Sequence, residues 1–244
     1  MVRQVLGIAH NYRQSAAFRL SRVRDISAHH SAQAEDQFSY FRKAQNDITA
    51  HGKVAILKHP RTGGWDVARP EAELVVLYGA RHRPVAITLG NDFTLGVELE
   101  GRYQAQGKWF DGTWWGKSRP GLCSYGPVWH LLSGLDCNLG DLRIELEIFR
   151  GTESIFCRSF RVGDWRWSLE EVPERVVTLW RKFGHNLPPS KEVMVEQEML
   201  PAGTAIFLGT GIIVPPRAYS LEGDIIVVSS PKLGVLRNEV IRVE

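Results

Sequence analysis

Short apolar runs separated by turn-forming residues are the feature that most limits how this chain can fold. From about Val54 onward, runs of four to eight residues alternate with glycine, proline, asparagine and aspartate. Runs of this length are typical of strands, whereas helices are usually longer. The expected strands span 54–57, 72–78, 85–89, 142–149, 205–208, 225–228 and 240–243. The pattern predicts a mainly β (α+β) fold with a few short helices.

One of these runs also predicts which side chains face the core. Ile144, Leu146 and Ile148 alternate with charged residues, so one face of this strand is expected to be buried and the other wet. A helix is expected over 168–183, where apolar residues recur every three to four positions. Ser168 and Glu171 have the spacing of a capping box at its start.

Composition excludes several classes of protein. The chain has 244 residues, 43% of them hydrophobic and 23% charged, which is not the composition of a disordered chain. The longest apolar candidate, 203–214, is too short and too rich in glycine to span a membrane. The first residues lack the apolar run and cleavage site of a signal peptide. Three cysteines without CxxC spacing predict neither a disulfide framework nor a zinc site. We expect a cytoplasmic protein without a membrane partner.

The net charge of +3 is concentrated at the N-terminus. The first 50 residues hold seven basic and four acidic residues, and the rest of the chain is balanced. We expect residues 1–50 to form a cap or lid in front of a β-rich catalytic body over 51–244, within a single domain overall. Arginines of the lid would draw in a small anionic substrate. They form no helical stripe and no recognisable motif, so no nucleic-acid partner is expected.

Three carboxylates are the most informative candidates for chemistry. In a strand, Glu71 and Glu73 lie on the same face, where their charges repel unless a cation or a shared proton separates them. Asp92 follows another apolar run, in a turn at a strand end. Three carboxylates are the oxygen ligands expected of Mg²⁺ or Mn²⁺. The alternative is that Glu71 and Glu73 belong to the solvated face of an edge strand.

An ordered set of short motifs gives these carboxylates a context. The motifs are VLGIAHNYR at 5–13, PEAEL at 70–74, GND at 90–92, GKS at 116–118, GP at 126–127, LGTG at 208–211 and LRN at 236–238. Together they resemble the fumarylacetoacetate hydrolase superfamily. The resemblance covers residues 1–15 and about 50–244, whereas 16–49 match poorly.

The resemblance implies a mixed β-sandwich roll that forms a homodimer. It implies a metal, Mg²⁺ or alternatively Mn²⁺ or Ca²⁺, held by Glu71, Glu73 and Asp92. It also implies that Lys117 acts on the substrate or its enolate, and that a turn at Thr210 binds the substrate carboxylate. Tyr12 and Arg13 are implied in substrate binding. Without the resemblance, Lys117 would be read as a surface lysine and Thr210 as part of a plain turn.

The chain departs from the family at the water-activating dyad. The positions of its histidine and glutamate are taken by Ser15 and Phe18, and neither side chain can serve as a base. His10, His29 or His30 would have to substitute. The segment LCSYGP at 122–127 looks more like the branch that dehydrates 2-oxo-3-deoxy sugar acids.

We therefore expect a metal-dependent enzyme acting on a 2-oxo acid or a 1,3-dicarbonyl compound, with a lyase or dehydratase favoured slightly. Lys117 is a candidate base, and Glu98 or Glu100 a candidate acid. The alternatives are a C–C bond hydrolase and an inactive binding or assembly protein. A group of tryptophans is expected either to pack in the core or a dimer contact, or to wall an apolar substrate pocket; its members are Trp109, Trp114, Trp115, Trp165 and Trp167.

Overall fold

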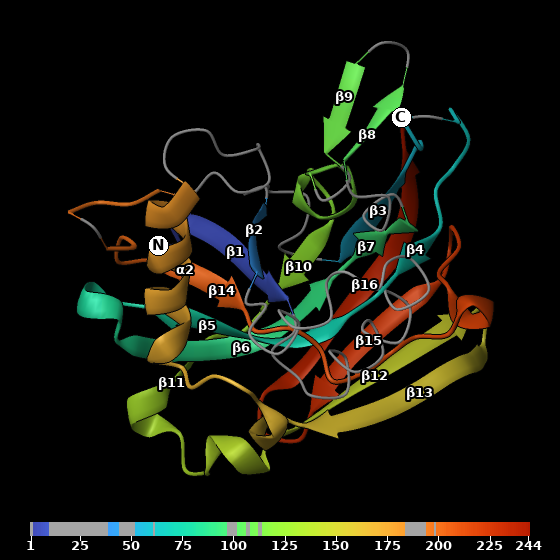
Figure 1. Ribbon diagram of the computed structural model, residues 1–244. Coiled ribbons are helices and arrows are strands. Elements are labelled where there is room, and N and C mark those ends of the chain that lie inside the picture. The colour runs from blue at the N-terminus through green and yellow to red at the C-terminus, as the bar shows by residue number, and fades with distance from the viewer. Residues whose placement is uncertain are drawn as a thin grey trace, which may run out of the picture.

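The larger of two main sheets has seven strands (Figure 1). The computed structural model describes residues 2–9, 39–43, 52–60, 62–96, 102–105, 108–111, 114–183, 194–197 and 199–244. The strands of the larger sheet are β1 (Gln4–Ala9), β2 (Ser39–Lys43), β5 (Ala72–Tyr78), β6 (Pro84–Asp92), β10 (Cys123–Tyr125), β11 (His130–Leu131) and β14 (Thr204–Phe207). Their order is β10-β6-β5-β14-β1-β2, and β11 also pairs with β6.

The second sheet has five strands and packs against the first. Its strands are β3 (Lys53–Leu57), β12 (Arg143–Arg150), β13 (Glu153–Arg161), β15 (Ile225–Ser230) and β16 (Gly234–Val243), in the order β13-β12-β15-β16-β3. Two further pairs complete the described strands: β4 (Ala68–Arg69) with β7 (Thr94–Leu95), and β8 (Arg102–Ala105) with β9 (Lys108–Asp111).

Both main sheets are mixed. β1 is parallel to β14, and β3 is parallel to β16, whereas the other pairs are antiparallel. Each parallel pair joins an early strand to a late one, so β1 and β3 are each held beside a strand from the last 45 residues. The prediction of a mainly β, mixed-sheet fold with few helices is confirmed.

The core lies between the two sheets, as the alternation in the sequence predicts. Ile144, Leu146 and Ile148 on β12 are fully buried, while the charged residues between them reach the other face. Leu74 and Val76 on β5 are equally buried and belong to the same apolar cluster. Burying a side chain of this size stabilises the fold by about 1.5–3 kcal/mol. These buried residues therefore favour the strand register that keeps them in the core.

The α-helix α2 (Glu171–Phe183) shares this core and lies in front of β5 and β14 in Figure 1. The predicted capping box is confirmed, because the Ser168 backbone amide donates to the Glu171 carboxylate and the Glu171 amide donates to the Ser168 hydroxyl. The helix itself begins at Glu171, three residues after the expected start at residue 168. Val172 and Val176 are buried against the core. The Tyr78 hydroxyl donates to the Leu169 carbonyl at 2.8 Å and ties the segment before the helix to β5.

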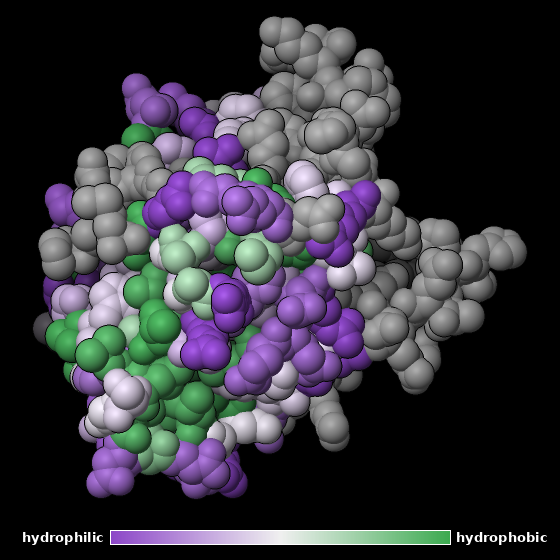
Figure 2. All heavy atoms as spheres, turned by 90° about the vertical axis from the view of Figure 1, so that its left-hand side faces the viewer, coloured by the Kyte–Doolittle hydropathy of each residue, from purple (hydrophilic) through white to green (hydrophobic). Residues whose placement is uncertain are grey.

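The opposite face of the larger sheet carries a second, smaller apolar cluster. Its five buried members come from four strands, β1, β5, β10 and β14: Val5, Val75, Cys123, Ala205 and Phe207. Exposed apolar residues, among them Val85, Val128 and Leu131, come from β6, β11 and the segment before β11. Figure 2 shows hydrophobic residues gathered in the lower part of the face on the left of Figure 1, where β11 lies. The larger sheet therefore buries apolar residues on both faces.

Two strands of the N-terminal segment belong to this sheet. β1 and β2 lie within residues 1–50 and pair with each other and with β14. Residues 10–38 and 44–51 lie outside the described residues, so the lid stays a prediction. Within the described part of the chain, no helix is long and apolar enough to cross a membrane.

Candidate metal and substrate site

Alternation along three strands brings the candidate site together on the face of the larger sheet that points away from the sheet–sheet core. On β5, Leu74 enters the core and Glu73 points to the other side; on β6, Asp92 lies on that same side. Lys43, at the end of β2, follows the same rule. Glu73 and Asp92 are thus placed by the apolar neighbours Leu74 and Phe93, which point into the core.

The three predicted carboxylates form one cluster. Glu71, Glu73 and Asp92 each offer an oxygen, and these atoms all lie within 4.8 Å of one another. The backbones of Glu71 and Asp92 exchange hydrogen bonds of 2.9 and 3.0 Å, which fixes the two strand ends side by side. Glu73 is 1% and Asp92 0% exposed. A solvated edge strand, the alternative reading of this motif, does not fit such burial.

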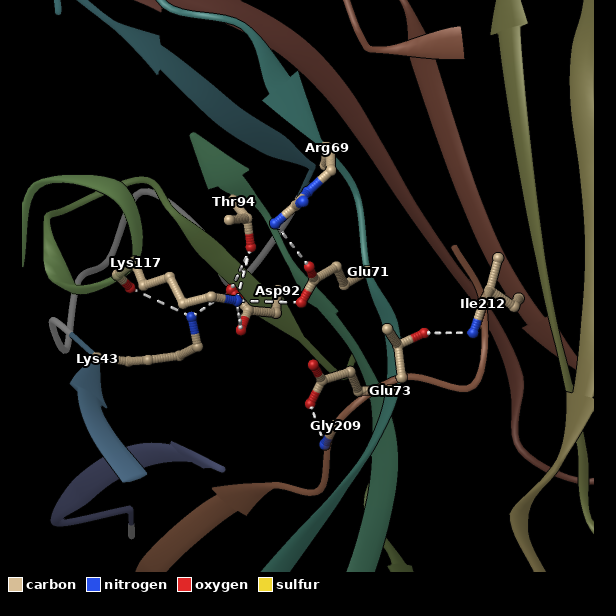
Figure 3. A network of polar contacts seen from close by, with 10 residues as sticks. Lys43, Arg69, Glu71, Glu73, Asp92, Thr94, Lys117, Gly209 and Ile212 are labelled. Atoms are coloured by element: carbon tan, nitrogen blue, oxygen red, sulfur yellow. Dashed lines mark hydrogen bonds and ion pairs between the residues drawn. The ribbon is translucent and has the colours of Figure 1, made fainter. Parts of the chain in front are cut away.

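Lys117 reaches the cluster from the short helix η4 (Trp114–Ser118). Its ammonium donates to Glu71 at 3.0 Å, to Asp92 at 3.0 Å and to the Thr94 hydroxyl at 2.8 Å (Figure 3). An ammonium group has three hydrogens, and these three acceptors match them. Lys117 is therefore a buried residue held at the carboxylates and not a surface lysine.

A second lysine, Lys43, meets the same carboxylate from β2. Its ammonium donates to Asp92 at 2.6 Å and to the Lys117 carbonyl at 3.2 Å, and its side chain is fully buried. The Phe41 ring centre is 5.0 Å from this ammonium and the Phe207 ring centre 5.4 Å. Cations are attracted to aromatic faces at such distances. Asp92 thus lies between two ammonium groups.

Within the described part of the chain a third cation, Arg69, completes the group, and its guanidinium lies 3.3 Å from Glu71. Three carboxylates are therefore matched by three cationic side chains, and the charges of the group formally cancel. The ion pairs are distributed unevenly over the three carboxylates. Among the described residues Glu73 makes no ion pair, and its carboxylate accepts the Gly209 backbone amide at 2.7 Å (Figure 3).

The ionised form of Glu73 is consequently disfavoured by its surroundings. Burial, together with the neighbouring charges of Asp92 and Glu71, raises its pKa well above the usual range. A cation bound between the carboxylates would relieve this repulsion. The donor set is made of hard oxygens, as Mg²⁺, Mn²⁺ and Ca²⁺ require. The residues present therefore fit a divalent metal ion, with Glu71, Glu73 and Asp92 as its ligands.

Solved structures of several enzymes share this architecture, although no family model and no curated protein matches the chain. The apo form of 2-keto-3-deoxy-D-arabinonate dehydratase matches with a TM-score of 0.73 and 18% identity, over 100% of this chain and 74% of that one. The same enzyme complexed with magnesium and 2,5-dioxopentanoate gives a TM-score of 0.70 at 19% identity, over 99% and 73%. A probable 2-hydroxyhepta-2,4-diene-1,7-dioate isomerase from Mycobacterium abscessus gives 0.58 at 22%, over 99% and 76%.

The chain has the fold of the fumarylacetoacetate hydrolase superfamily. The resemblance seen in the sequence motifs is confirmed at the level of the fold. The PEAEL, GND and GKS motifs of that resemblance supply the three carboxylates and Lys117 of the cluster.

Thr210 lies just beyond the cluster. It is 9% exposed, and its hydroxyl accepts the Ile212 backbone amide at 3.1 Å, which closes a local turn. The residue before it, Gly209, donates to Glu73. The observed contact of the LGTG motif with the cluster is thus made by the backbone amide of Gly209. Substrate binding by Thr210 stays a prediction.

Other sequence predictions fall outside the described residues. These are Tyr12 and Arg13, the dyad positions Ser15 and Phe18, the histidines His10, His29 and His30, and the acids Glu98 and Glu100. The described tryptophans support the packing alternative in part. Trp167 is 5% exposed in the core, and Trp115 and Trp165 pack against it.

Sequence reasoning missed Lys43, Arg69 and Thr94. A signal for Lys43 was present, because Phe41 and Lys43 alternate with Tyr40 and Arg42 as in a strand. That segment was assigned to the lid. Arg69 and Thr94 lie on the short paired strands β4 and β7, and sequence alone does not show that these strands meet beside Glu71 and Asp92.

A second acidic group lies on the smaller sheet. Glu145, Glu147 and Cys157 bring ligand atoms within 4.8 Å of one another, but they are exposed or half-buried. Glu145 and Glu147 also lie on the solvent-facing side of strand β12. The alternation of this strand accounts for their position without a ligand. They serve below as a control for the buried cluster.

Proposed function

We propose that this chain is a divalent-metal-dependent enzyme that acts on a 2-oxo acid or a 1,3-dicarbonyl compound through an enolate. The observation that carries the proposal is the group of three carboxylates, buried and within 4.8 Å of one another, with a lysine ammonium held against two of them. A merely structural role would leave unexplained why Glu73 is buried beside two other carboxylates without an ion pair among the described residues, since buried carboxylates are normally paired.

Glu71, Glu73 and Asp92 would hold the metal. A bound Mg²⁺ or Mn²⁺ supplies a Lewis acid that polarises the 2-oxo group and acidifies the adjacent C–H. Lys117 contributes a cation at a fixed place beside these ligands. Its three hydrogen bonds hold the ammonium in place before the substrate arrives, so that its positive charge can stabilise negative charge that develops on an enolate oxygen.

We favour elimination of water over C–C bond hydrolysis. Ser15 and Phe18 cannot form the water-activating dyad that hydrolysis needs in this family. The likeness to 2-keto-3-deoxy-D-arabinonate dehydratase, at a TM-score of 0.73, supports the same choice. The isomerases among the similar structures have lower TM-scores, of 0.57 and 0.58.

A second candidate is a binding or assembly protein that keeps the fold without the chemistry. The observation favouring it is that Lys43, Arg69 and Lys117 already offset the charges of the three carboxylates. Such an internally balanced cluster can hold the two strand ends together without a metal.

Turnover with and without metal separates these candidates. The purified protein is given a 2-oxo-3-deoxy sugar acid, oxaloacetate and an acylpyruvate, each with Mg²⁺ or with EDTA, and Glu73→Gln is run in parallel. The enzyme proposal expects Mg²⁺-dependent turnover of at least one compound, lost in Glu73→Gln. Absence of metal-dependent turnover from the whole panel supports the binding protein. The expected partners are a small anionic substrate and a second copy of the chain, and gel filtration with light scattering tests the homodimer.

A further inference from the structure

Of the two lysines described at the site, Lys43 has the contacts expected of a cation that releases its carboxylate partner when a metal ion binds. Lys117 has three acceptors, two of them carboxylates, and is held from several directions. Among the described residues, Lys43 has a single carboxylate partner, Asp92, and its second hydrogen bond goes to a backbone carbonyl. A metal ion at Asp92 would therefore compete with the only ion pair that Lys43 makes among the described residues, whereas Lys117 would keep its hydrogen bond to the Thr94 hydroxyl.

The rest of the surroundings of Lys43 would persist without Asp92. Its ammonium lies 5.0 Å from the Phe41 ring centre and 5.4 Å from that of Phe207, and both rings are buried. Gly7 makes room for the first ring, since a Cβ there would lie 2.4 Å from Phe41. Gly90 does the same for Phe207, at 2.5 Å. Two aromatic faces and one carbonyl form a place in which an ammonium can stay.

We propose that Lys43 is a built-in cation that neutralises Asp92 in the metal-free protein and yields this carboxylate to the metal ion. This inference rests on the proposed metal site. A dication and an ammonium at one carboxylate repel each other in a buried site. Lys43 thus lowers the affinity for the metal, and in return it stabilises the metal-free protein.

The test measures metal binding directly, with Mn²⁺ as the probe and isothermal titration calorimetry as the readout. Lys43→Met keeps most of the stem and removes the charge. It should bind Mn²⁺ about tenfold more tightly than the wild type, because like-charge repulsion at the site is gone. Lys58→Met is the matched control. Lys58 also pairs with a carboxylate and lies 5.5 Å from a ring centre, that of Trp65, but it is half-exposed and outside the site.

Thermal unfolding gives a second readout. In EDTA, Lys43→Met should melt below the wild type, because Asp92 loses a buried partner. Saturating Mn²⁺ should narrow this difference. Equal or weaker Mn²⁺ affinity in Lys43→Met overturns the proposal. If this variant does not fold without metal, Lys43→Gln should show the same tighter binding, and wild-type affinity in that variant overturns the proposal as well.

Failure of the metal site itself would look different. If the wild type, Lys43→Met and Lys58→Met all bind no Mn²⁺, the proposed function is wrong, and the exchange at Asp92 falls with it. If the wild type binds Mn²⁺ and the charge of Lys43 makes no difference, only the exchange is wrong.

Discussion

The carboxylate of Glu73 accepts a hydrogen bond of 2.7 Å from the backbone amide of Gly209. This contact joins β5 to the turn that follows β14, and it fixes the one carboxylate of the cluster that makes no ion pair among the described residues. Gly209 has a φ of +83°, a conformation that residues with a Cβ adopt only with strain.

Gly209→Ala should therefore weaken both the fold and the metal site. We expect a loss of about 1 kcal/mol in the free energy of unfolding, from strain at positive φ. We also expect weaker Mn²⁺ binding, because the amide that orients Glu73 moves. Gly223→Ala is the control, since Gly223 has the same φ of +83° away from the site. It should lose similar stability and keep its Mn²⁺ affinity; a parallel loss of affinity would remove the special role of the Gly209 amide.

Glu73→Gln should make the metal-free protein more stable. Burial and the charges of Asp92 and Glu71 raise the pKa of Glu73, so its ionised form is unfavourable in the folded state. A neutral amide removes this repulsion and keeps an oxygen for Gly209. We expect the Tm in EDTA to rise by about 3 °C, as a gain of 1 kcal/mol gives for a chain of this size. Calorimetry in EDTA measures it, and a lower Tm than that of the wild type would argue against repulsion at Glu73.

Lys117→Met should abolish most of the activity if Lys117 stabilises the enolate. Loss of one preorganised donor lowers kcat by about 10²–10³-fold in comparable sites. Thr94→Val removes only the hydroxyl that accepts from Lys117, and it should have a much smaller effect. Steady-state kinetics on the compound turned over most rapidly provides the comparison. Similar losses in both variants would indicate that the position of the helix η4 matters and not the charge of Lys117.

A buried amide network behind the site should matter for stability. Asn91 donates to Asn238 at 3.0 Å, and Asn238 donates to Ser124 at 2.9 Å, which ties β6 and β10 of one sheet to β16 of the other. Asn238→Ala leaves buried polar groups unpaired, so we expect a loss of about 2 kcal/mol. Urea unfolding measures this loss. Glu239→Ala, at the next position and exposed, should change little, and an equal loss there would point to β16 itself.

The capping box of α2 should contribute a pH-dependent stability. The Ser168 backbone amide and hydroxyl lower the pKa of Glu171. A carboxyl with a lowered pKa in the folded state stabilises the fold above its unfolded pKa, and this contribution is lost as the pH falls through the folded value. The wild type should thus exceed Glu171→Gln in stability at neutral pH, and the difference should shrink as the pH falls below about 4 and through the lowered pKa of Glu171. A difference that is independent of pH would exclude the charge as its cause.

Local patterns predicted much of the fold, because strands and helix ends obey short-range rules. The alternation at Ile144, Leu146 and Ile148 predicted their burial, and Ser168 with Glu171 predicted the helix start. The same rule put Glu71 and Glu73 together. The contact of both with Asp92 depends on how β5 pairs with β6, which is a property of the sheet and not of either strand.

The part of the site that sequence reasoning did not find comes from distant strands. Lys43 reaches Asp92 across 49 positions, from a β2 strand that lies beside β1. No local sequence pattern predicts that Lys43 and Asp92 lie close together, because their contact depends on the parallel pairing of β1 with β14. Lys117, by contrast, was found through a motif, since Gly116 and Ser118 on either side of it resemble the motif of a known family.

Calorimetric titration of Mn²⁺ tests the central claim, that Glu71, Glu73 and Asp92 hold a divalent metal ion. The wild type should bind one ion per chain at this site, and Glu73→Gln should lose it. Glu147→Gln, in the exposed acidic group of the smaller sheet, should bind like the wild type. Equal binding by the wild type and Glu73→Gln, or loss of binding only in Glu147→Gln, would contradict the claim.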